Sequence, residues 1–101
     1  MALGLIEAVG LSTAMAALDA ATKCADVTLA GYDRVIGAGK AVTVTLNLSG
    51  DVASVQAAVE AGKRAGERAG TILAAHVIPS PHEDVNKVIA KYEKSFPLGE
   101  E

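Results

Sequence analysis

Eight residues near the middle of the chain, 42–49, alternate strictly between apolar and polar side chains in the order VTVTLNLS. Successive side chains of a β-strand point to opposite faces of a sheet, so a period of two predicts a strand with one buried face. Val42, Val44, Leu46 and Leu48 form the predicted buried side. The chain is therefore expected to build a sheet that is covered on one face and open on the other.

The rest of the sequence supplies the elements that accompany this strand. The patterns predict further strands over 27–32, 2–8 and 71–78, with a polar, glycine-containing loop over 33–41. Helices are predicted over 11–25, from Asp51 to about Gly70, and over 84–94. The order β-α-β-β-α-β with a C-terminal helix predicts an α+β fold of the ferredoxin-like, split β-α-β type, with an antiparallel sheet and helices on one face.

Two features of the predicted helices can be tested against the structure. For the first helix we expect Ser12 or Thr13 as N-cap, and for the second Asp51. The expected buried stripes are Leu11, Met15, Leu18 and Ala21 or Thr22 in the first helix, and Val52, Val55, Val59, Gly62 and Gly66 in the second. Helix glycines are destabilising by up to about 1 kcal/mol relative to alanine. We interpret them as positions of close backbone packing; the alternative is that they are incidental small residues.

Composition predicts one domain that associates with copies of itself. The 101 residues allow a single domain, 1–101, with a core over about 2–92 and a flexible tail over 93–101. Half of the residues are apolar but only 3% are aromatic, and the mean hydropathy is +0.32. A small core of small side chains hides this much apolar surface poorly, so we expect a homo-oligomer.

Charge, cysteine content and hydropathy exclude several function classes. A net charge of −3 argues against binding to duplex nucleic acid. The single cysteine excludes an internal disulfide and fits a reducing cytosol. No apolar run reaches the length of a membrane span, and the N-terminus does not resemble a signal peptide. A cytoplasmic protein is expected.

The ten residues 76–85, HVIPSPHEDV, gather two histidines, two prolines and two carboxylates. A metal site of His76, His82 and the acids is disfavoured, because nothing in the spacing makes the two rings converge. Pro79 and Pro81 restrict the backbone and favour a rigid corner leading into a helix. We predict an architectural corner and no metal site.

Two weaker signals also fail to indicate catalysis or a cofactor. Cys24 has Lys23 as its only nearby positive charge and no evident histidine base, so a partly buried, unreactive thiol is expected. Residues 37–40, GAGK, lack the rest of a phosphate-binding loop and precede a strand instead of a helix. With no acid–base pair, triad or cofactor motif, we expect neither an enzyme nor a bound cofactor.

Four segments in order, ALGLIEAVG, LDAATKCADVTLAGYD, SGDVASVQAAVEAG and AAHVIPSPHEDV, resemble the bacterial microcompartment shell proteins of the single-domain, hexamer-forming class. The resemblance covers residues 2 to about 89. It implies a cyclic homohexamer that tiles a polyhedral shell in the cytoplasm. Paralogous shell proteins are then expected partners, and encapsulated enzymes are a further candidate class.

The resemblance also implies which residues meet the neighbouring hexamer. The expected hexamer-edge residues are Lys23, Asp26, Pro79, Ser80, Pro81 and His82. Relatives commonly have arginine where this chain has Ser80, and asparagine near the position of Asp26. Loss of an arginine removes five N–H donors from each edge contact, so we expect this chain alone to form sheets less readily than its relatives do.

The same resemblance implies a central pore lined by Gly37, Ala38, Gly39 and Lys40. The loop is about four residues longer than the common pattern and has alanine in place of the usual serine. Six Lys40 ammonium groups would favour anionic metabolites; the alternative is a solvated Lys40 away from the axis. For Arg34 a position away from the axis is the preferred interpretation.

A second function class stays open from the sequence. Ferredoxin-like oligomers also serve as small-molecule-binding regulatory modules, with a ligand pocket between subunits. A saturable ligand site would identify that class, and a native mass of six subunits would favour the shell protein.

Overall fold

The structure, a computed structural model, describes residues 1–36 and 42–80. Its elements are β1 (Ala2–Val9), α1 (Leu11–Cys24), β2 (Thr28–Ile36), β3 (Val42–Gly50), α2 (Val52–Ala69) and β4 (Thr71–Ile78). This order confirms the predicted β-α-β-β-α-β arrangement. The predicted C-terminal helix, 84–94, and the tail, 93–101, lie outside the described residues.

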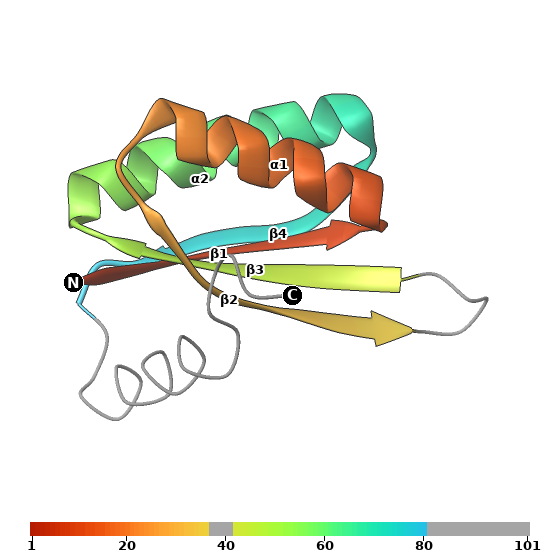
Figure 1. Cartoon of the computed structure of the whole chain (residues 1–101), viewed down its shortest axis with the longest axis horizontal. Coiled ribbons are helices and arrows are strands. Elements are labelled where there is room, and N and C mark those ends of the chain that lie inside the picture. The colour runs from red at the N-terminus through yellow and green to blue at the C-terminus, as the bar shows by residue number, and fades with distance from the viewer. Residues whose placement is uncertain (37–41, 81–101) are drawn as a thin grey trace.

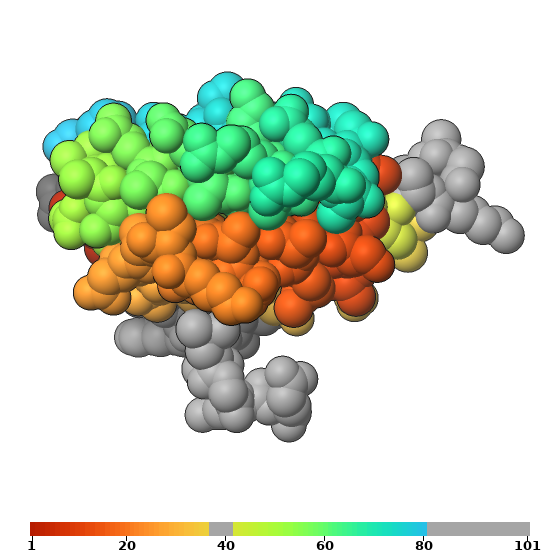
Figure 2. Space-filling view, turned by 90° about the horizontal axis from the view of Figure 1, so that it is seen from above, coloured from red at the N-terminus to blue at the C-terminus, as the bar shows by residue number. Residues whose placement is uncertain are grey.

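The four strands form one antiparallel sheet in the order β2-β3-β1-β4. Helices α1 and α2 lie side by side on one face of this sheet (Figure 1). In the helix-side view they form a continuous layer (Figure 2). The predicted α+β class, with helices on one face of an antiparallel sheet, is confirmed.

The strand pattern of residues 42–49 has the predicted consequence for burial. Val44, Leu46 and Leu48 of β3 are all at most 3% exposed. Their partners in the neighbouring strand β1 are Ala8, Ile6 and Gly4, in that order. Directly opposed residues of an antiparallel pair point to the same face, so these rows form the sheet side of the core beneath the helices.

Helix α2 begins as predicted at an Asp51 cap. The backbone N–H of Ser54 donates to Asp51 Oδ1 at 2.9 Å, and the Ser54 hydroxyl donates to Oδ2 at 3.0 Å. These two hydrogen bonds, the backbone one first, hold the pKa of Asp51 below its ordinary value of 3.8. The cap thus satisfies one of the free N–H groups at the start of the helix.

The glycines of α2 are sites of close packing, as interpreted from the sequence. A Cβ atom added to Gly62 would lie 2.7 Å from Ile6 Cδ1 and 3.0 Å from the carbonyl oxygen of Ala17. One added to Gly66 would lie 2.9 Å from Ile72 Cγ1. The missing side chains therefore let α2 approach both the sheet and α1.

The predicted stripes of the two helices are partly wrong. In α1, Leu11 and Met15 are more than half exposed; the buried residues are Thr13, Ala14, Ala17 and Ala21. In α2, Val52 is exposed and Ala58 is buried instead. The reason is the close approach of α1 to the glycine side of α2, which accepts small side chains and turns the large ones outward.

Two boundaries also differ from the predictions. Helix α1 begins at Leu11 with Gly10 in the cap position at φ 90°, and no side chain caps it, so the Ser12 or Thr13 cap is wrong. Strand β2 continues to Ile36, which pairs with Val42, although a loop was expected from Asp33 onward. Pairing with β3 holds residues 33–36 in the sheet.

Candidate functional site

The described residues contain no candidate metal centre. No group of three or more His, Cys, Asp or Glu side chains gathers within 1–36 and 42–80. His76 is exposed on β4, and His82 lies outside the described residues. Cys24 is exposed, not partly buried as expected, and its Sγ lies 3.8 Å from the Ala57 carbonyl oxygen. No helix of the described part is long and apolar enough to span a membrane.

The described residues of the predicted hexamer edge lie in two segments, one at the end of α1 and one after β4. Both segments are at the same end of the sheet. Lys23 and Asp26 lie at and after the end of α1, while Pro79 and Ser80 follow β4. Thr28 pairs with Ser49, Ser49 with Leu3, and Leu3 with Ile78, so one row of the sheet joins the two segments. Thr28 and Ile78 lie at opposite edges of that row, three strand spacings or about 14 Å apart.

Two of the predicted edge residues, Pro81 and His82, lie outside the described part of the chain. Pro79 and Ser80 are both exposed directly after β4. Asp26 is exposed too, and its carbonyl oxygen packs over Gly50, where an added Cβ would lie 3.2 Å away. The four described edge residues are therefore accessible to another molecule.

Lys23 has a partner on its own helix that sequence reasoning missed. Its Nζ lies 3.0 Å from Asp19 Oδ2, and both side chains are well exposed. Exposed pairs at this spacing stabilise a helix by only about 0.3–0.5 kcal/mol, so Lys23 is readily released to another partner. Opposite charges four residues apart on a predicted helix would have indicated Asp19 as the partner of Lys23.

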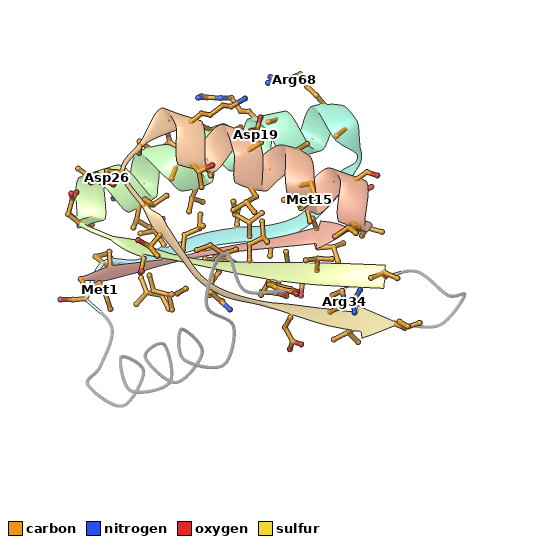
Figure 3. All side chains as sticks on the ribbon, in the orientation of Figure 1. Met1, Met15, Asp19, Asp26, Arg34 and Arg68 are labelled. Carbon is orange, nitrogen blue, oxygen red and sulfur yellow. The ribbon has the colours of Figure 1, made fainter. Side chains whose placement is uncertain are left out.

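The predicted pore residues Gly37, Ala38, Gly39 and Lys40 lie outside the described residues. The two strands that flank this loop, β2 and β3, are described. Ile36 of β2 pairs with Val42 of β3, so the connection between the strands leaves the sheet at the end of β2. The eight residue steps from Thr28 to Ile36 span about 27 Å. Asp26 lies at one end of the molecule and Arg34 toward the other (Figure 3).

Exposed apolar side chains occur on both lateral flanks of the sheet. On the β2 side, Val35 is 58% and Ile36 74% exposed, and Met15 of the adjoining helix is 53% exposed. On the β4 side, Leu73 is 54% exposed. The sheet order separates β2 and β4, so a single protomer leaves apolar surface on two opposite sides.

A groove of about 420 Å³ runs along the second of these flanks, between α2 and β4. Its apolar part comes from Val59, Ala75 and Val77, and Glu60 and Lys63 supply charged groups. It is an open surface feature, in contrast to the enclosed pockets that usually hold small molecules.

Comparison with known proteins gives consistent matches over most of the chain. The BMC domain family matches residues 2–81. The chain is 47% identical over 90 residues to the bacterial microcompartment shell protein PduA of Salmonella typhimurium, covering 89% of this chain and 92% of that protein. It is 42% identical over 91 residues to the carboxysome shell protein CcmK2 of Synechococcus elongatus, covering 88% and 85%.

A solved structure supports the fold. It is described as a microcompartments protein from Desulfitobacterium hafniense, and it superposes with a TM-score of 0.71 at 37% identity. The match covers 85% of this chain but 47% of that one, so this chain spans about half the length of the solved protein.

Proposed function

The chain belongs to the BMC domain family, and from this premise we propose that it is a structural shell protein of a bacterial microcompartment. In this proposal six copies form a cyclic hexamer, and hexamers tile the shell in the bacterial cytoplasm together with paralogous shell proteins. The role is structural and not catalytic. Small polar or anionic metabolites cross the shell through the centre of the hexamer, and enzymes are enclosed within it.

One observation carries this proposal. The β2–β3 connection leaves the sheet at the end opposite Asp26 and Ser80. A tile with a central pore needs its pore segment near the axis and its edge segments at the perimeter. Strands that run outward from the axis meet this requirement, and the exposed apolar flanks on either side then face neighbouring copies.

The first prediction concerns the mass of the native particle. Six copies of the 10.2 kDa chain give about 61 kDa, and we expect this mass by light scattering behind size-exclusion chromatography. The physical reason is that the apolar surface of both flanks is removed from water only when a ring closes. A monomer, dimer or trimer at micromolar concentration would contradict the sixfold pore.

The second prediction concerns Ser80 as an edge residue. We expect Ser80→Arg to increase the formation of flat sheets, observed by electron microscopy, because a guanidinium adds five N–H donors to each edge contact. Ser12→Arg is the matched control: it adds the same group at an exposed position near the opposite end of the molecule. If both variants form sheets equally, Ser80 is not an edge residue.

A further inference from the structure

The two lateral flanks carry complementary groups at the same level along the strands. Arg34 of β2 pairs with Val44, Val44 with Ala8, and Ala8 with Ile72 of β4, so these residues form one row across the sheet. This row is on the face that the helices cover, because Val44 and Ala8 belong to the core. Arg34 and Ile72 therefore mark equivalent levels on opposite edges.

Helix α2 places a carboxylate at this level on the β4 flank. A Cβ added to Gly66 would contact the side chain of Ile72, so Gly66 lies over the row. Glu67, the next residue, is exposed. It lies four residues after Lys63 and seven after Glu60, both of which line the groove beside β4, so helical spacing turns it toward that flank.

Apolar side chains accompany both charges. An added Cβ at Gly70 would meet Thr13, and one at Gly66 would meet Ala17. Met15, midway between Thr13 and Ala17, therefore lies within one residue of the level of Glu67. Leu73 follows Ile72 and is left out of the pairing with β1, where the register shifts, and it is exposed. Each flank thus presents a charge with an apolar neighbour.

We propose that the β2–α1 flank of each protomer (Met15, Arg34, Ile36) docks against the α2–β4 flank of the next (Glu60, Glu67, Leu73), with Arg34 opposite Glu67. This inference rests on the proposed cyclic hexamer. Rotation about the axis preserves distance from the axis, so groups at one level on opposite flanks meet in a ring. The flanks differ, so the contact is head-to-tail.

Charge supports this partner. Among the described residues the one ion pair joins Lys23 and Asp19, and neither Arg34 nor Glu67 forms an ion pair with any of them. Asp33, the acid beside Arg34, pairs with Thr45 on the opposite face of the sheet, and its Oδ1 accepts a hydrogen bond at 2.9 Å from the backbone N–H of Arg34. On the other flank Glu60 and Glu67 outweigh Lys63, leaving a net negative charge.

The test is a charge reversal followed by native mass measurement across a dilution series. We expect Arg34→Glu and Glu67→Arg each to raise the protein concentration at which the hexamer dissociates by roughly tenfold or more, because like charges then face each other. The double variant Arg34→Glu/Glu67→Arg restores the wild-type value. Arg68→Glu, an equal charge change on the outward side of α2 (Figure 3), leaves it unchanged.

A second measurement tests contact directly. Met15→Cys with Leu73→Cys, in a Cys24→Ser background, is expected to give a covalent ladder up to six chains with a short bismaleimide. Head-to-tail contact is required for chains longer than two. If wild type is hexameric but the single reversals match Arg68→Glu and no ladder forms, the docking is overturned while the shell function stands. If wild type is not hexameric, the proposed function fails first.

Discussion

Replacing Ile6 with alanine is expected to lower the free energy of unfolding by about 3–4 kcal/mol. Ile6 is fully buried in the central strand β1, between Leu46 of β3 and Ala75 of β4. Its Cδ1 lies under Gly62, where no side chain fills the space that a shorter residue would leave. Truncation therefore removes buried methyl groups and creates a cavity that neighbouring residues fill poorly.

The measurement is urea unfolding followed by circular dichroism at one fixed protein concentration, because association changes apparent stability. Ile6→Val is expected to have a smaller effect, about 1 kcal/mol. Val52→Ala is the control, since Val52 is 42% exposed at the start of α2; its effect stays within about 0.5 kcal/mol. Equal losses at positions 6 and 52 would show that Ile6 is not a core residue.

Replacing Gly62 with valine is expected to be about as damaging, with a loss of about 3 kcal/mol. The first carbon of any side chain at this position would lie 2.7 Å from Ile6 Cδ1 and 3.0 Å from the Ala17 carbonyl oxygen. The second contact is with the backbone of α1, which cannot rotate away as a side chain does. Helix α2 must then move off the sheet or off α1.

Arg64→Val is the matched control for this substitution, because it places the same side chain two residues further along α2 at an exposed position. Thermal unfolding at fixed concentration compares the two variants. The combination of Gly62→Val with Ile6→Ala should lose less stability than the sum of the single changes, because the two sites are in contact. Additive losses would place the conflict elsewhere, and equal stability of the two valine variants would contradict the close packing.

The fold itself was largely predictable from particular residues. The alternation in 42–49 predicted which side of β3 is buried. Asp51 was predicted as the N-cap of α2, and its hydrogen bond with Ser54 confirms this. These signals are local: strand alternation and a helix cap depend on residues a few positions apart. The order of the elements then restricted the topology to the split β-α-β arrangement that the sheet has.

The candidate site was less accessible from the sequence. The resemblance selected Lys23, Asp26 and Ser80, but only the register of the strands brings their two segments to one end of the sheet. The ion pair of Lys23 with Asp19 was not predicted, although opposite charges four residues apart on a helix indicate such a pair. For Arg34 a position away from the axis was preferred, but the sequence did not indicate a partner, because its level relative to Glu67 depends on pairings across the whole sheet.

By itself the sequence determined the class of fold, the elements with strong local patterns and the family. Only the tertiary structure decided which side of α1 is buried, whereas four of the five residues predicted for the buried stripe of α2 are buried. Large side chains such as Leu11 and Met15 suggested one side of α1, but the glycines of α2 admit only the small residues of another. The physical reason is that burial depends on the space a partner element leaves, and that space is set by residues distant in the chain.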